Sequence, residues 1–185
     1  PAQRYRTFHL RLTMMERDMV DKLILLFIFD KLEVPMQEDI VVDMASSNEW
    51  LPYIDCKDGF ASLVSSGFLT NVAQSKSKPR YAITSDGREC LSHFYTNIPS
   101  SLRDDIVEHI KENRFAYRKK QDYSSDYFKN NDGSYTVVLK IESTSVQLLE
   151  LKLTIQNRNN AKWIYKNWPE KASTIYEFIH ENLLE

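Results

Sequence analysis

Apolar residues in the first part of the chain repeat at the spacing of α-helices. From Glu16 to Leu32 they recur three and four positions apart, and nearly every position in the second half of this segment is apolar. The pattern predicts a first helix with a deeply buried centre. Pro35 ends it, because proline disfavours helical geometry in the residue before it. Two further helices are predicted, over about residues 37–45 and 53–66.

After Gly67, which stands where a helix end favours a left-handed residue, the pattern changes to short strand-like runs. The runs "FLTNVA" and "RYAI" flank the polar segment "QSKSKP", and together they predict a β-hairpin. A helix then begins, with Thr84 as its N-cap and Asp86 in its first turn. Gly87 costs about 0.5 to 1 kcal/mol relative to alanine inside a helix. We therefore expect a neighbouring backbone packed too closely for a Cβ atom.

The second half of the chain changes to a period of two. Residues 134–141 and 145–155 alternate between apolar and polar, and with "SDYF" before them they predict a three-stranded antiparallel meander. Two helices are predicted to close the chain, over about residues 158–167 and 169–183. The second of them would begin with Pro169 in its first turn, a position that suits proline.

The order of three helices, a hairpin and a fourth helix is that of a winged helix-turn-helix. The predicted fold class is therefore α+β, with an N-terminal winged helix-turn-helix, a connector helix and a small C-terminal domain of an antiparallel sheet plus helices. The predicted parts are an N-terminal arm (1–15), the winged helix-turn-helix domain (16–98), the connector helix (99–120) and the C-terminal domain (121–185), a three-stranded meander plus two helices.

The stretch "RYAITSDGRECLSHF" resembles the Tyr-x-Leu/Ile-Thr-x-x-Gly-x-x-x-Leu signature of many bacterial winged-helix regulators. In that signature the second strand of the wing runs through a threonine cap directly into the next helix. The chain matches it at Tyr81, Ile83, Thr84, Gly87 and Leu91.

From about residue 17 onward the chain also resembles a bacterial family catalogued as a domain of unknown function, number 4364. The resemblance rests on "KLILLFIFDKLEVPM", "LVSSGFL", "YAITSDGRECLSHF", "IPSSLRDDI", "NDGSYTVVLKI" and "AKWIYKNW". It implies a winged helix followed by an α+β tail. The family's label carries no activity, so the resemblance assigns no functional residue.

The charge of the chain gives weak support for DNA binding. The chain has 24 Lys and Arg against 26 Asp and Glu, a net charge of -2, without the basic excess typical of nucleic-acid-binding domains. The helix expected to enter a major groove, residues 53–66, turns Asp55 and Asp58 outward, with Lys57 at the border of that face. Because phosphates repel aspartates, this helix is a poor match for the DNA backbone.

Basic residues gather on the predicted wing. Each cation that neutralises a phosphate adds a salt-dependent increment to affinity, so the wing is expected to contact the backbone, unless it is simply a solvated loop. Arginines 4, 6 and 11 of the N-terminal arm are available for the same role. The predicted DNA-binding residues are Lys57, Lys76, Lys78 and Arg80.

The sequence favours a DNA-binding transcriptional regulator of the winged-helix type, with the C-terminal domain for dimerisation or effector sensing. The alternative is a winged helix used as a protein-protein interaction or dimerisation module without DNA binding. We expect a cytoplasmic homodimer, with room for a small-molecule effector of unknown identity. No membrane segment is predicted, because the longest uncharged apolar run, Leu23 to Phe29, is far shorter than the roughly 20 residues that span a bilayer.

No pattern in the chain predicts an enzyme. The four histidines lie in separate segments, the four glycines form no phosphate loop, and no catalytic, cofactor or metal site is expected. Cys56 and Cys90 are expected to be reduced thiols. Aromatic residues of the closing segment, including Trp163 and Trp168, are expected either to fill the core or to form a ligand or dimer surface.

Overall fold

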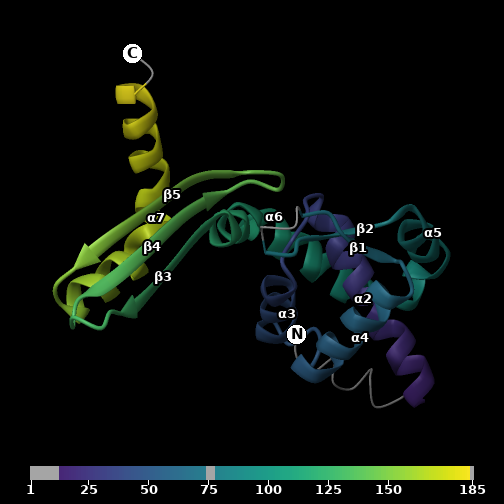
Figure 1. Cartoon of the computed structure of the whole chain (residues 1–185). Helices are drawn as coiled ribbons and strands as arrows, with labels where there is room; N and C mark the ends of the chain where they lie inside the picture. The colour runs from purple at the N-terminus through teal and green to yellow at the C-terminus, as the bar shows by residue number, and fades with distance from the viewer. Residues whose placement is uncertain (1–12, 74–77, 184–185) are drawn as a thin grey trace. The chain divides into compact units, whose positions relative to one another are not determined.

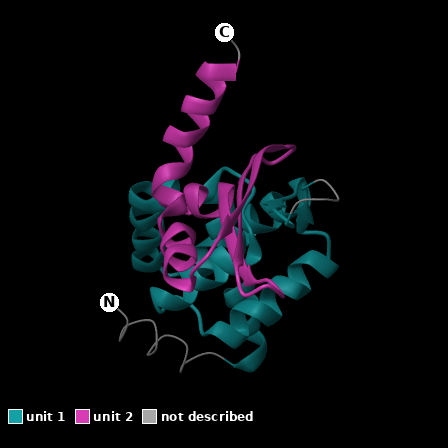
Figure 2. Cartoon of the chain, turned by 60° about the vertical axis from the view of Figure 1, so that its left-hand side comes forward, with its two compact units in different colours: residues 1–73, 78–115 teal, residues 74–77, 116–185 magenta. Residues whose placement is uncertain are grey.

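The computed structural model describes residues 13–73 and 78–183 and divides into two compact units (Figures 1 and 2). Unit 1 holds the described residues up to Phe115, and unit 2 begins at Ala116. The division falls inside α6, so most of the predicted connector helix belongs to unit 1. In order, the elements are α2 (Met14–Leu32), α3 (Glu38–Ser47), α4 (Tyr53–Ser65), β1 (Leu69–Asn71), β2 (Tyr81–Ile83), α5 (Ser85–Phe94), the 3-10 turn η1 (Tyr95–Asn97), α6 (Ser100–Asp122), β3 (Tyr123–Lys129), β4 (Tyr135–Glu142), β5 (Gln147–Ile155) and α7 (Arg158–Leu183).

Helix α2 forms the centre of unit 1. Its buried middle was predicted, and Ile24 and Ile28 are fully buried. The helix begins two residues before the predicted start because Thr13 and Glu16 form a capping box, in which each side chain bonds the backbone N–H of the other. None of the helices in residues 13–73 and 78–183 is long and apolar enough to cross a membrane.

Helices α3 and α4 pack against each other, and α4 also packs against α2. The ring of Phe60 on α4 lies 6.0 Å from that of Phe29 on α2 and 4.8 Å from that of Tyr81 on β2, measured between centroids. Gly67 follows α4 with a φ of 74°, the left-handed conformation predicted for it. These contacts turn the inner face of α4 toward the core and leave its other face to solvent.

Strands β1 and β2 form a two-stranded antiparallel hairpin, in which Leu69 pairs with Ile83. The side chain of Thr84 accepts a hydrogen bond from the N–H of Gly87 at 3.1 Å, which confirms the predicted N-cap of α5. A Cβ atom on Gly87 would lie 2.5 Å from the carbonyl oxygen of Phe68. The closely packed backbone that was expected beside Gly87 is therefore that of Phe68, at the start of the hairpin.

Unit 2 is a three-stranded antiparallel sheet, with β4 in the middle and α7 packed on one face. In the pairing of β4 with β5, Leu139 faces Leu151 and Val137 faces Leu153, as the alternating pattern predicts. The buried core lies between this face and the helix. It consists of Val137, Leu139, Ile141, Ala161, Trp168 and Ala172.

The prediction of two closing helices is wrong, because α7 continues through Pro169. Trp168 and Ala172, on either side of the proline, pack into the same core, and their burial keeps the chain helical there. Proline lacks the N–H that would bond the preceding turn, and its ring crowds that turn, so it bends a helix without always ending it. Figure 1 shows α7 changing direction along its length.

Candidate nucleic-acid interface

The N-terminal end of α4 is open to solvent. Pro52 precedes the helix, and the first two helical residues are exposed, Tyr53 by 53% and Ile54 by 64%. On the opposite side of α4, Cys56 and Phe60 are buried. The helix therefore presents two large apolar side chains at the end from which a groove-binding helix contacts base edges.

The rest of the outward face of α4 is acidic, as predicted. Asp58 is exposed and Asp55 is half-buried. The Nζ atom of Lys57 donates a hydrogen bond to the carboxylate of Glu38 and lies 4.0 Å from that of Asp39. This hydrogen bond raises the pKa of Lys57 above its ordinary value. The positive charge of Lys57 is thus neutralised within the protein.

The predicted basic residues of the hairpin have different positions. Lys78 is exposed. Arg80 is only 2% exposed, so the expectation that it faces outward on the wing is not met. Its backbone is held at the start of β2, where the N–H donates to Asn71 Oδ1 at 3.2 Å and the carbonyl accepts from Val72 at 2.8 Å. Lys76 and the arginines at 4, 6 and 11 lie outside the described residues.

Beneath α4 lies a buried carboxyl group that was not predicted from the sequence. Asp21 of α2 is buried, and burial raises its pKa to about 7, with further contributions from the negative charges of Asp55 and Asp18. The signal for its burial was present in the sequence. Asp21 stands three and seven positions before Ile24 and Ile28, on the face of α2 that these residues bury.

Both cysteines are free thiols. Cys56 on α4 is fully buried, and burial raises the pKa of its thiol to about 12, assisted by the negative charges of Asp21 and Asp55. Cys90 on α5 is half-buried. The side chain of Cys56 therefore belongs to the packing beneath the outward face of α4 and is not a nucleophile.

The two tryptophans of α7 do not form one surface. Trp168 is 2% exposed, lies in the core of unit 2 and donates a hydrogen bond from Nε1 to the carbonyl oxygen of Lys140 at 3.0 Å. It is therefore not part of a ligand or dimer surface. Trp163 is 61% exposed and remains available for one.

A sequence model of one protein family, described as "Domain of unknown function (DUF4364)", matches residues 21–183 and so covers most of the chain. No curated protein and no solved structure matches the chain. The family's description names no activity, substrate or partner. The functional conclusion therefore depends on the geometry of the chain itself.

Proposed function

The chain belongs to the domain-of-unknown-function 4364 family, and from its geometry we propose that it is a DNA-binding protein of the winged-helix type, related in function to transcriptional regulators. In this proposal α2, α3 and α4 are the helical part and the β1–β2 hairpin is the wing. The observation that carries it is the exposed N-terminal end of α4, on a framework whose hairpin leads directly into α5.

The exposed end of α4 offers two kinds of base contact. Tyr53 and Ile54 present apolar surface that suits the methyl group of thymine, and Asp58 can accept a hydrogen bond from the amino group of cytosine. Backbone contacts then come from the hairpin, where Lys78 is exposed and Lys76 stands two positions before it. Because one chain offers few cations on this proposed DNA-facing surface, we expect a modest affinity for DNA with a shallow salt dependence.

We expect Lys76→Ala with Lys78→Ala to weaken binding to a random DNA duplex. Each lost phosphate contact lowers the slope of log affinity against log salt by about 0.9, so the double variant should lose about 2 from the slope of one bound chain. Fluorescence anisotropy at several salt concentrations measures both quantities. The matched control is Lys162→Ala with Lys166→Ala, which removes two exposed lysines from α7.

Two results would count against the proposal. If the wild-type protein does not bind duplex even at low salt, DNA binding is excluded for this chain. If it binds, and the hairpin variant has the same salt slope as the α7 control, the hairpin does not contact phosphates.

The second candidate is a protein-docking module, which the acidic surface of α3 and α4 favours. The only lysine in the described parts of these helices, Lys57, is already paired with Glu38, while Asp39 and Asp58 are exposed. Such a surface suits a basic partner better than a phosphate backbone. This candidate predicts no duplex binding at low salt by the wild-type protein.

We also propose that unit 2 forms a homodimer through the exposed surface of α7 around Trp163. Large exposed apolar side chains are common at the centre of protein interfaces. Trp163→Ser is expected to weaken the dimer by at least about 10-fold, whereas Lys162→Ser on the same turn leaves it unchanged. Analytical ultracentrifugation measures the dissociation constants. A wild-type protein that stays monomeric at high concentration contradicts this part of the proposal.

A further inference from the structure

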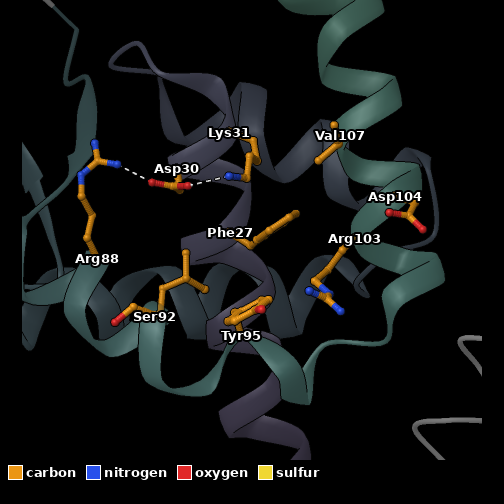
Figure 3. A pocket seen from close by; sticks show the side chains of 10 residues that line it. Phe27, Asp30, Lys31, Arg88, Ser92, Tyr95, Arg103, Asp104 and Val107 are labelled. Carbon is orange, nitrogen blue, oxygen red and sulfur yellow. Dashed lines mark hydrogen bonds and ion pairs between the residues drawn. The ribbon is translucent and has the colours of Figure 1, made fainter.

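A cavity of about 480 Å³, open to solvent on one side, lies in unit 1 between α2, α5, η1 and α6 (Figure 3). Its volume falls in the ordinary range of small-molecule sites, roughly 300 to 1,000 Å³. Its walls combine apolar surface with a few charged groups. The apolar part consists of Phe27, Leu91, Tyr95 and Val107.

Arg103 of α6 lines this cavity with an unsatisfied hydrogen-bond donor. Its guanidinium carbon lies 4.8 Å from the centre of the Tyr95 ring, so the two groups are stacked on one wall. Its Nε atom is buried, and no group in the described part of the chain accepts a hydrogen bond from it. Nor does any carboxylate of these residues lie within ion-pair distance of it. Because this atom has almost no accessible surface, the terminal N–H groups of the guanidinium are the donors left to meet a ligand in the cavity.

The other charged groups leave the cavity slightly positive. The carboxylate of Asp30 bonds both Arg88 and Lys31, the latter at 3.0 Å (Figure 3). One carboxylate is thus shared by two cations. With Arg103 and the exposed Asp104, three cations and two carboxylates line the cavity, a net charge of one positive.

We propose that this cavity binds a small organic monocarboxylate with an aromatic or branched apolar body. The guanidinium of Arg103 binds the carboxylate, because a planar fork of donors matches it in a charge-assisted pair. The apolar body packs on Phe27, Leu91 and Tyr95. A single negative charge balances the net charge of the walls, whereas a phosphate dianion would exceed it and leave the site with a net negative charge. The site does not depend on DNA binding.

Phenylacetate is a suitable probe, with acetate and phenylacetamide as matched controls. Acetate keeps the charge without the ring, and phenylacetamide keeps the ring without the charge. Isothermal titration calorimetry with the full chain at neutral pH is expected to show binding of phenylacetate. Both controls should bind at least about 10-fold more weakly, because each lacks one of the two complementary contacts.

Two substitutions locate the site. Arg103→Leu should weaken phenylacetate binding by about 10- to 100-fold, the usual range for a charge-assisted hydrogen bond. Arg114→Leu is the matched control, because Arg114 is on the same helix, is ion-paired with Glu33 at 3.5 Å and does not line the cavity. Ser92→Trp, on an exposed residue of the α5 wall, should fill the cavity and abolish binding even if Arg103→Leu fails to fold.

Nuclear magnetic resonance of the wild-type chain gives an independent readout. Phenylacetate is expected to shift the backbone amide signals of Leu91, Ser92 and Tyr95. The proposal is overturned if no heat and no shifts appear up to about 50 mM phenylacetate, a weak limit even for a fragment-sized ligand. It is equally overturned if acetate binds as well as phenylacetate, or if Arg103→Leu, folded, binds as tightly as Arg114→Leu.

Discussion

Gly87→Ala is expected to lower the free energy of unfolding of unit 1 by about 3 kcal/mol, at the upper end of the range for overpacking. The added Cβ would lie 2.5 Å from the carbonyl oxygen of Phe68 and 2.9 Å from Cγ1 of Ile83. The side chain of Ile83 can adjust, but the carbonyl of Phe68 is backbone. It accepts the N–H of Thr84 at 3.0 Å, so moving it breaks the join between the hairpin and α5.

Gly59→Ala is the matched control for this substitution. Gly59 also lies inside a helix, α4, but its added Cβ would lie 3.1 Å from Cδ1 of Leu25, the end of a flexible side chain. Alanine gains up to about 1 kcal/mol in helix propensity, which offsets the contact. Urea unfolding followed by circular dichroism should therefore give a value within about 1 kcal/mol of wild type for this control. An equally small effect of Gly87→Ala would show that the start of the hairpin moves freely.

Asp21→Asn is expected to raise the free energy of unfolding by about 1 to 3 kcal/mol at pH 8 and to change it little near pH 4. The pKa of Asp21 is raised from 3.8 to about 7, first by burial and then by the charges of Asp55 and Asp18. At pH 8 the folded protein must hold this carboxylate ionised. About three pKa units correspond to a cost of up to about 4 kcal/mol. An uncharged amide avoids that cost but still requires hydrogen bonds.

The pH dependence has a definite sign. Because the pKa of Asp21 is higher in the folded state, the folded protein keeps a proton between about pH 4 and pH 7 that the unfolded chain has released. Rising pH therefore removes stability across this window, and the loss is complete above about pH 7. Subtracting the unfolding free energy of the wild type from that of the variant cancels the contributions of other titrating groups. One of these is His109, whose pKa is lowered by burial.

Urea denaturation at pH 4 and pH 8, followed by circular dichroism, measures this difference. Asp58→Asn is the control, because Asp58 is an exposed carboxylate on the neighbouring helix. Its effect should be within about 0.5 kcal/mol at both pH values. A loss of stability in Asp21→Asn at pH 8 would mean that the carboxylate is ionised and well paired in the folded protein.

Local signals in the sequence were sufficient to predict much of the fold. The N-cap of Thr84, the left-handed Gly67 and the crowding at Gly87 all follow from the properties of single residues, and each is confirmed. The alternation in β4 likewise predicts its buried face. The predicted helix break at Pro169 is wrong, because the burial of Trp168 and Ala172 in the core outweighs the tendency of proline to end a helix.

Side-chain environments were harder to predict than elements. Arg80 is adjacent to a polar loop in sequence, but its position at the start of β2 leaves it buried. Lys57 pairs with Glu38, which is 19 positions earlier in the chain and on another helix. The periodicity of a single helix indicates only neighbours three or four positions apart, so it does not reveal this pair. The cavity beside Arg103 is formed by four elements, α2, α5, η1 and α6, so its residues share no sequence pattern.

Because Cys56 is buried, the reaction of its thiol with an alkylating reagent can report how often unit 1 opens. A thiol with a pKa of about 12 and no solvent contact is protected from alkylating reagents while unit 1 stays closed. Cys90, which is half-buried, is the accessible site and can be blocked first. The rate at which reagent then modifies Cys56 gives the opening rate around α4 when reaction is faster than reclosing, and is proportional to the open population when reclosing is faster. The Cys56 sulfur atom that packs in the core thus reports how often the core opens to solvent.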